Sequence, residues 1–400
     1  MYSEKKKFHL ELDKPVVVAL QPADEERVWG RWQFPKLQRT TAGHILASFA
    51  YGSDSLQYED IPHSMVSEDQ GKNWRDTRED DRPAYPKMQN GKCFAGFVKR
   101  GCRQTDYLDA YTPVYDNGVQ KWYLAEDIAE DTDKKVCAME YDPETGKTDT
   151  FECTIHWPNM PLVVYPGNQV YPVTMIFALC NKHGVHVING DLYYMLYWEG
   201  FDSAETDRTQ LAEKTGVAHV YIFKSADCGH TWELYSQILA DKEEFDRKDG
   251  SEGYSEPHMA RMPDGSWVML TRTGSNHTSY IARSVDDCKT WTKPVPFDTI
   301  GVLPQILPLA CGVTLASYGR PEMRIRATAD PSGLQWEAPI TVELYGMDKE
   351  LWDHRSCYYT NLLPLDDCTA LMIYSDFQYP DADGNRVKAI MTRQIHVVME

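Results

Sequence analysis

The chain has 400 residues, of which 60 are acidic and 41 are lysine or arginine, so its formal net charge is −19. An acidic chain without a basic stripe fits neither nucleic acid nor an anionic bilayer, since both are bound through clustered lysine and arginine. Hydrophobic residues make up 42% and aromatic residues 12% of the chain. This composition excludes a disordered protein, because disordered chains lack the apolar surface needed to offset their conformational entropy.

The predicted elements are almost all strands. Short runs that alternate in polarity, or are rich in β-branched and aromatic residues, recur along the chain, whereas few runs have the helical period. In chain order the clearest are 15–20, 44–50, 219–224, 266–272, 312–318 and 370–376. Turn sequences such as Pro263-Asp264-Gly265 separate the runs and supply the backbone geometry that a hairpin needs. The chain is therefore predicted to be all-β.

The N-terminal residues and the cysteines bear on where the protein works. A basic cluster near the start is followed by Glu11, Asp13 and Lys14, where a signal peptide would carry an unbroken apolar run. No window approaches the roughly 18 uncharged apolar residues of a membrane-spanning helix. The ten cysteines are scattered without a C-x-x-C pair, which predicts neither a zinc knuckle nor a dense disulfide scaffold. We expect a cytoplasmic protein with reduced thiols; the alternative is an exported protein that has lost its leader and carries one or two disulfides.

A short repeated motif organises the chain. Residues 67–74 (SEDQGKNW) and 225–232 (SADCGHTW) both fit the pattern S-x-D-x-G-x-x-W. Near matches are 284–291, with Cys288 in the place of the glycine, and 328–336, with one extra residue. In each motif the aspartate is expected to cap backbone N–H groups, the glycine to take the left-handed conformation, and the tryptophan to fold back onto the neighbouring sheet. The aspartates are therefore predicted to be structural and not catalytic.

The spacing of the motif predicts the architecture. Asp227, Asp286 and Asp330 recur at intervals of roughly 40 to 60 residues, close to the length of a propeller blade. We predict one domain over 1–400, a six-bladed β-propeller of four-stranded antiparallel blades, because radial repetition lets one body reach this length. The blades are expected at 31–75, 93–155, 170–235, 255–297, 303–343 and 357–398. The strand around Val16-Val17-Val18 is expected to close the last blade.

Two later segments, together with the repeated motif, resemble the sialidase superfamily of Asp-box (BNR-repeat) propellers. Ser255-Glu256-Pro257-His258, followed by a strand that ends at Arg272, is similar to the blade that supplies a buried glutamate and an arginine. The strand end 315–320 is similar to the one that supplies a second arginine, here Arg320. The resemblance implies that the two guanidinium groups bind a substrate carboxylate, for which their planar geometry suits bidentate hydrogen bonds. His258 is expected to line the same mouth.

A third segment, 356–367, resembles the one that holds the nucleophilic tyrosine of the family. Its spacing to the turn at Asp366-Asp367 favours Tyr359 over Tyr358. The resemblance implies that Tyr359 attacks the sugar while Glu256 takes its proton. A phenol suits an anomeric carbon that bears a carboxylate, because an aspartate or glutamate nucleophile would be repelled by that charge.

Two functional positions of the family have no clear counterpart in this sequence, namely the general acid and a further arginine. In the family the acid is an aspartate on a loop of the first blade, and here that loop offers Asp60, Asp54 and His63, in that order of preference. The family's first strand carries an arginine in an aromatic-Arg-Ile-Pro pattern, whereas residues 32–35 place Gln33 there. Glutamine donates hydrogen bonds but cannot make a charge-assisted fork. The incomplete clamp favours another sugar, or a sugar acid bound less through its carboxylate, over sialic acid itself.

The resemblance implies an exo-acting, retaining glycoside hydrolase that releases a terminal sialic acid or a related acidic sugar from a glycan. One alternative is a propeller polysaccharide lyase, in which a tyrosine and a histidine remove the proton α to a uronate carboxylate. Another is a non-catalytic carbohydrate-binding propeller, which would have no need of the pair Tyr359 and Glu256. The sequence has no metal-ligand cluster, phosphate loop or nucleophile elbow, so we expect neither metal nor cofactor and a carbohydrate as the partner. Nothing in the sequence predicts the oligomeric state.

Overall fold

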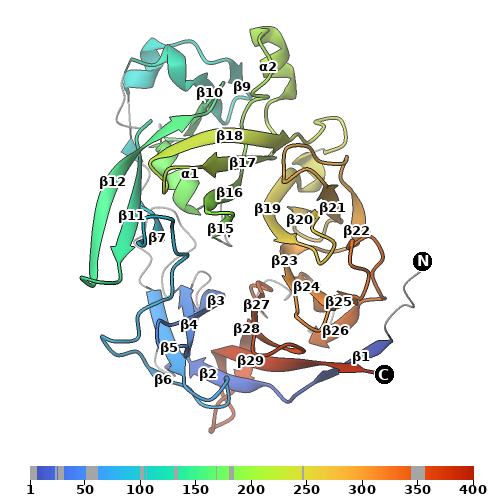
Figure 1. Ribbon diagram of the computed structural model, residues 1–400. Helices are drawn as coiled ribbons and strands as arrows, with labels where there is room; N and C mark the ends of the chain where they lie inside the picture. Colours follow the sequence, from blue (N-terminus) through green and yellow to red (C-terminus); the bar gives the residue numbers. More distant parts are fainter. Residues whose placement is uncertain are drawn as a thin grey trace.

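The structure is a computed structural model, which describes residues 7–22, 25, 31–50, 62–99, 103–104, 106–129, 134–167, 169–179, 184–245, 247–343 and 356–400. Its sheets follow one another around a central region, as Figure 1 shows, which is the arrangement of a propeller. Strands dominate the described ranges, so the prediction of an all-β chain is confirmed.

Three sheets have the four-stranded antiparallel form expected of a blade, and each is built from consecutive strands. The first contains β3 (Gln33–Arg39), β4 (Ile45–Ala50), β5 (Pro62–Ser67) and β6 (Arg75–Asp76). The second contains β19 (Ser251–Arg261), β20 (Trp267–Gly274), β21 (Ser279–Ser284) and β22 (Val295–Asp298). The third contains β23 (Val302–Pro308), β24 (Thr314–Gly319), β25 (Met323–Thr328) and β26 (Ile340–Glu343). The strands predicted at 44–50, 266–272 and 312–318 are thus β4, β20 and β24.

The C-terminal sheet is completed by the N-terminal end of the chain. Its strands are β27 (Asn361–Pro364), β28 (Thr369–Pro380) and β29 (Arg386–Met399), with β1 (Phe8–Leu12) and β2 (Val16–Leu20) both paired to β29. Val16 of β2 lies opposite Thr392 of β29 in an antiparallel register. The prediction that the strand around Val16-Val17-Val18 closes the last sheet is confirmed.

The middle of the chain departs from the predicted blade boundaries. One sheet joins β15 (Val185–Ile188), β16 (Asp191–Trp198), β17 (His219–Ser225) and β18 (Thr231–Ile238) to β12 (Lys147–His156), β11 (Val136–Asp142) and β7 (Cys93–Phe97). Another consists of β8 (Arg103–Gln104), β14 (Gln169–Val170), β13 (Pro161–Tyr165), β10 (Lys121–Leu124) and β9 (Tyr115–Asp116). The expected unit 93–155 is therefore divided between two sheets, because the end of β12 pairs in parallel with β18 and the short strands of 103–124 pair with 161–170.

Helices are few and short, as the sequence predicts. The α-helices are α1 (Val173–Leu179) and α2 (Arg208–Lys214), and the 3-10 turns are η1 (Tyr107–Ala110), η2 (Ala125–Asp127) and η3 (Arg247–Asp249). Helix α1 is apolar and buried, and α2 begins after Asp207, whose carboxylate accepts the N–H of Thr209 at 2.9 Å. None of the helices in the described ranges has the length and apolarity needed to cross a membrane.

The repeated motifs form the predicted turns. In the motif at 225–232, Ser225 Oγ accepts the N–H of Gly229 at 2.9 Å and Asp227 accepts the N–H of Thr231 at 2.8 Å. The equivalent bonds in the other two turns of the same length are Gly71 to Ser67 at 2.8 Å, Asn73 to Asp69 at 2.8 Å, Cys288 to Ser284 at 3.0 Å and Thr290 to Asp286 at 2.9 Å. Cys288 takes the left-handed conformation of the glycine it replaces, with φ of 67°. The aspartates are engaged with their own turns, which confirms the predicted structural role.

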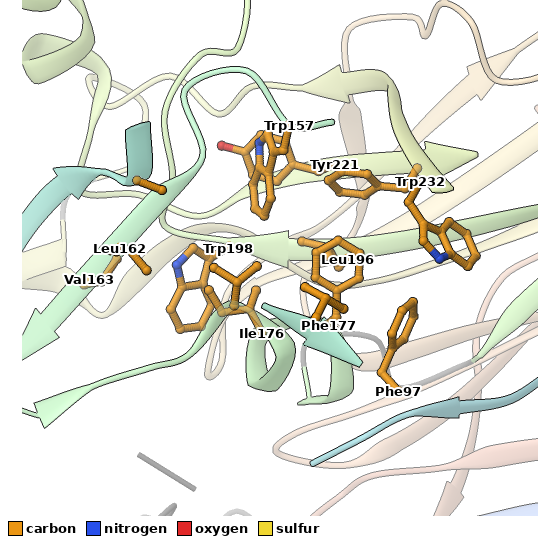
Figure 2. Close-up of a cluster of buried hydrophobic side chains, with 14 of the residues drawn as sticks. Phe97, Trp157, Leu162, Val163, Ile176, Phe177, Leu196, Trp198, Tyr221 and Trp232 are labelled. Atoms are coloured by element: carbon orange, nitrogen blue, oxygen red, sulfur yellow. The ribbon is translucent and has the colours of Figure 1, made fainter. Parts of the chain in front are cut away.

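The tryptophan of the repeated turn enters the core. Trp232 is fully buried in the cluster drawn in Figure 2, where its ring meets Phe97 at 5.5 Å, and its Nε1 donates to the carbonyl of Gly229 at 2.9 Å. The same cluster contains Phe177 of α1 and Trp157, which follows β12. A fully buried tryptophan whose N–H is bonded contributes a large apolar area without an unpaired donor. This cluster therefore ties the repeated turn to the sheets on either side.

Hydrogen bonds between the first strands of neighbouring sheets hold the centre together. Side chains of one strand bond the main chain of the next in three places: His258 Nδ1 accepts from Ile306 N at 2.8 Å, Gln305 Nε2 donates to Leu362 O at 3.2 Å, and Asn361 Oδ1 accepts from Leu37 N at 2.8 Å. They link β19, β23, β27 and β3 in succession, and all three side chains are buried. Buried polar side chains that are bonded in this way set the position of each sheet against the next.

Candidate active site

The candidate site lies beside the first strands of four sheets, and each strand, or the segment directly before it, carries a residue with a positive φ angle. Phe34, Glu256, Leu303 and Tyr358 have positive φ angles of 55°, 47°, 41° and 61°. The strand register shifts at the first three of these positions, which marks a β-bulge. Positive φ is costly for side chains of this size and is concentrated at functional sites, where the surrounding structure enforces it.

Groups from three sheets meet at Glu256, which are the side chains of Tyr359 and Arg272 and the backbone N–H of Leu303. Tyr359 Oη donates a hydrogen bond to Glu256 Oε1, and Arg272 Nη1 lies 3.1 Å from the same oxygen. The other carboxylate oxygen, Oε2, accepts the backbone N–H of Leu303 at 2.9 Å. Glu256 is 3% exposed, so its charge depends on partners within the protein such as these. Two of the catalytic residues predicted from the sequence, Tyr359 and Glu256, are thus in direct contact.

The electrostatics of this group hold the phenol protonated and the arginine charged. Burial first, and then the negative charge of Glu256, raise the pKa of Tyr359 well above its ordinary value. Burial acts to lower the pKa of Arg272, but the charges of Glu256 and Glu252 outweigh it and raise that pKa. At neutral pH Tyr359 is therefore a hydrogen-bond donor beside an ionised carboxylate. A hydroxyl held in this way can transfer its proton to the adjacent carboxylate.

The two predicted arginines converge through a shared serine. Ser275 Oγ accepts Arg320 Nη1 at 2.8 Å and Arg272 Nη2 at 3.2 Å. Arg320 also donates to the carbonyl of Cys357 at 3.2 Å, two residues before Tyr359. Both guanidinium groups are buried, with 8% of Arg320 and 9% of Arg272 exposed. The site therefore gathers two cations within reach of the tyrosine.

Arg272 also forms an ion pair with a second carboxylate, that of Glu252. Glu252 Oε1 lies 3.0 Å from Arg272 Nη2, and its Oε2 accepts the hydroxyl of Ser255 at 3.2 Å. The side chain of Glu252 is 40% exposed, so it lies at the open side of the group. Arg272 therefore forms ion pairs with two carboxylates, one buried and one at the open side.

A close backbone approach brings the strand end of Arg320 to the tyrosine segment. A Cβ on Gly319 would lie 2.2 Å from the carbonyl oxygen of Tyr358 and 2.8 Å from its Cβ. Only glycine fits there, so β24 can lie against the segment that leads to Tyr359. On the other side, Thr360 Oγ1 donates to Ser317 Oγ of β24 at 2.9 Å. Contacts on both sides of Tyr359 thus fix its place beside Glu256.

The side chain of Gln33 is buried beside the site. Its residue is fully buried, and neither the oxygen nor the nitrogen of its amide has a hydrogen-bond partner in the described part of the chain. The next residue, Phe34, packs its ring on that of Tyr359 with centroids 4.8 Å apart. An unbonded buried amide costs on the order of 1–3 kcal/mol for each group left unpaired. A buried amide in this state, next to a residue that touches Tyr359, is a candidate for bonding a ligand.

The remaining predicted residues lie elsewhere or outside the described ranges. His63 is exposed at the start of β5, with its ring 5.9 Å from that of Trp32. His258 lines a cavity of about 530 Å³ whose lining does not include the four converging side chains named above, and burial lowers the pKa of its ring well below the ordinary value. Asp54 and Asp60 lie outside the described residues, so the general acid stays a prediction.

Several residues of the site were not predicted from the sequence. Glu252 and Ser275 lie in segments that look like turn material, and Leu303 contributes only its backbone N–H. One signal was available, because proline follows the strained residue in Phe34-Pro35, Glu256-Pro257 and Leu303-Pro304. The repeated x-Pro marks the three bulges beside the site. Within the described residues no cluster of three or more histidine, cysteine or carboxylate side chains is placed to hold a metal ion.

Comparisons with known proteins bear on the fold. No family model matches the chain, and no curated protein matches it. A Dyadobacter fermentans protein of unknown function superposes with a TM-score of 0.61 at 16% identity, over 97% of this chain and 99% of the other. An α-L-arabinanase from Penicillium chrysogenum, solved with arabinobiose, gives 0.52 at 11% identity over 95% and 98%. A Hadza microbial sialidase aligns with 92% of this chain over 65% of its own length, at 14% identity and a TM-score of 0.45, which is too low to support a conclusion about the fold.

At these identities the likeness shows the fold alone. The chain shares its propeller fold with the Dyadobacter fermentans protein and with the Penicillium chrysogenum arabinanase. The activity has to be argued from the site.

Proposed function

We propose that the protein is an exo-acting, retaining glycoside hydrolase of the sialidase type, which releases a terminal sialic acid or a related acidic sugar from a glycan. We further propose that its six sheets act as the six blades of one propeller domain. The observation that carries the function is the buried contact of Tyr359 with Glu256, whose carboxylate is also paired with Arg272. A binding module or a purely structural centre has no need to bury a phenol against an ionised carboxylate, because that arrangement brings a desolvation cost.

In the proposed first step Tyr359 is the nucleophile. Its oxygen attacks the anomeric carbon, its proton passes to Oε1 of Glu256, and the bond to the leaving oxygen breaks while an acid protonates that oxygen. Asp60 and then Asp54 remain the candidates for this acid. In the second step water attacks the anomeric carbon and gives a proton to the acid residue that was deprotonated in the first step, while the bond to Tyr359 breaks and the phenol recovers its proton from Glu256. Two successive inversions leave the product with the configuration of the substrate.

Arg272 keeps the base in place and ionised until the proton arrives. The ion pair with Glu256 and the N–H of Leu303 orient the carboxylate towards the phenol. We assign the substrate carboxylate to Arg320 and Arg272, whose guanidinium groups converge on Ser275 Oγ. The amide of Gln33 then takes an uncharged polar group of the sugar, for which its unbonded oxygen and nitrogen are available.

The experiment is a screen of aryl glycosides of sialic acid and of other sugar acids with the full chain. Release of the aryl group by the wild type, and its loss in Tyr359→Phe, supports the proposal. A product that absorbs in the ultraviolet as an unsaturated uronate would instead identify the lyase. Binding to glycans without turnover across the whole panel would identify the non-catalytic propeller.

A further inference from the structure

Two cysteines from neighbouring sheets meet at their hairpin turns. Cys311 lies in the turn between β23 and β24, and Cys368 lies in the turn between β27 and β28. The backbone N–H of Cys311 donates to the carbonyl of Asp367, the residue before Cys368, at 2.9 Å. Both cysteines are partly exposed, and both pack against the same apolar cluster, which contains Leu309 and Leu362. The two turns are therefore in contact through their main chains, with one thiol on each.

The thiols themselves face one another. A hydrogen bond with the thiol of Cys311 is the first cause that raises the pKa of Cys368, to about 11, followed by burial and by the charges of Cys311, Asp366 and Asp367. A disulfide requires Cα atoms roughly 4.4 to 6.8 Å apart, a separation that a backbone hydrogen bond to the adjoining residue brings within reach. Partial exposure leaves both sulfurs accessible to a small oxidant. Cys357 shows the contrast, since it is fully buried and engaged with Ser375.

We propose that Cys311 and Cys368 form a redox-dependent cross-link between the sheet of β23–β26 and the sheet of β27–β29. The thiolate of one cysteine attacks a small-molecule disulfide such as oxidised glutathione, which releases one thiol and leaves a mixed disulfide. The second cysteine attacks that mixed disulfide, forms the S–S bond of the protein and releases the second thiol. The two cysteines lose two electrons and two protons in all, and the oxidant is reduced to two thiols.

The cross-link would lie at the strand ends away from the candidate site, so we expect it to affect stability and not the site itself. The two sheets that it joins supply Arg320 and Tyr359, but the turns lie at the opposite ends of those strands. Strand β24 begins at Thr314, beside the turn of Cys311, and ends at Gly319, directly before Arg320. The link therefore holds the far ends of the two sheets together without touching the site. The chain between the two cysteines is long, so closing it constrains the unfolded state strongly and raises stability.

The test uses the full-length wild type, incubated either with dithiothreitol or with oxidised glutathione, then alkylated, digested and analysed by mass spectrometry. We expect a peptide pair linked through Cys311 and Cys368 only after oxidation, and a melting temperature higher by roughly 3–5 °C. Cys311→Ser should abolish both the linked peptide and the shift. Cys93→Ser, which alters a partly exposed cysteine in β7, should keep both.

Two results would overturn the proposal. Full alkylation of both cysteines in folded, oxidant-treated wild type would show that the thiols do not join, and this result depends on no variant. A linked peptide with an unchanged melting temperature would show that the link does not hold the sheets together. Neither outcome bears on the glycosidase proposal, because the cross-link lies away from Tyr359 and Glu256.

Discussion

Replacing Tyr359 with phenylalanine removes one oxygen and leaves the rest of the site in place. The ring keeps its contact with Phe34, Glu256 keeps its bonds to Arg272 and to Leu303 N–H, and no cavity larger than a hydroxyl is created. What is lost is the hydrogen bond to Glu256 Oε1 and the nucleophile of the proposed first step.

The two losses differ in size. Removing a hydrogen bond to a charged group lowers the free energy of unfolding by about 1.5–3 kcal/mol, and two remaining partners of Glu256 place the effect at the lower end. Removing the nucleophile lowers kcat by at least about 10³-fold, which is about 4 kcal/mol of transition-state stabilisation. A variant that is folded and nearly inactive is therefore the expected result.

The chain offers a matched control in Tyr374→Phe. Tyr374 is also buried in the C-terminal sheet, and its hydroxyl donates to a glutamate, Glu343, at 2.9 Å, but it belongs to the apolar cluster behind the site. Both variants should lose a similar amount of stability in thermal unfolding, while only Tyr359→Phe loses turnover of the aryl glycoside. A folded Tyr359→Phe with kcat within about tenfold of wild type would refute the role of Tyr359 as nucleophile.

Four further predictions follow from the same geometry. Glu256→Gln keeps the shape of the side chain but removes the base, so kcat should fall by about 10²–10⁴-fold with the fold intact by circular dichroism. Gln33→Met removes an amide that has no hydrogen-bond partner among the described residues, so thermal unfolding should show unchanged or slightly higher stability, while KM for the substrate rises. Gly229→Ala places a Cβ 2.9 Å from Phe94 at a φ of 88°, which should lower the free energy of unfolding by about 1–3 kcal/mol in urea denaturation. Folding raises the pKa of Tyr359, so the protonated phenol stabilises the protein fully below about pH 10, and this stabilisation is lost as the pH rises towards the folded pKa. Above about pH 10 the melting temperature should therefore fall less steeply in Tyr359→Phe than in wild type.

The parts of the fold set by local chemistry could be predicted from the sequence. The turn at 225–232 needs only its own serine, aspartate and glycine to form, so its hydrogen bonds follow from the motif. The predicted blade at 93–155 failed because its outcome depends on long-range pairing. The last residues of β12 join β18 in parallel, and no pattern within 93–155 encodes that partner.

The same division holds for the site. Tyr359, Glu256, Arg272 and Arg320 could be named because each sits in a recognisable segment, and the structure brings all four together. Glu252 and Ser275 could not, since the bulged pairing of β19 with β20 alone brings them to the guanidinium group of Arg272.

The proposed chemistry is tested most directly by trapping the covalent intermediate. The wild type would be incubated with an activated, ring-fluorinated glycosyl fluoride of the best sugar-acid substrate, which slows the second step, and the labelled peptide would then be sequenced by mass spectrometry. We predict a single sugar adduct on the oxygen of Tyr359, absent in Tyr359→Phe and present in Tyr374→Phe. An adduct on a carboxylate such as Glu256 or Glu252, or hydrolysis that proceeds without any adduct, would contradict a tyrosine nucleophile at this site.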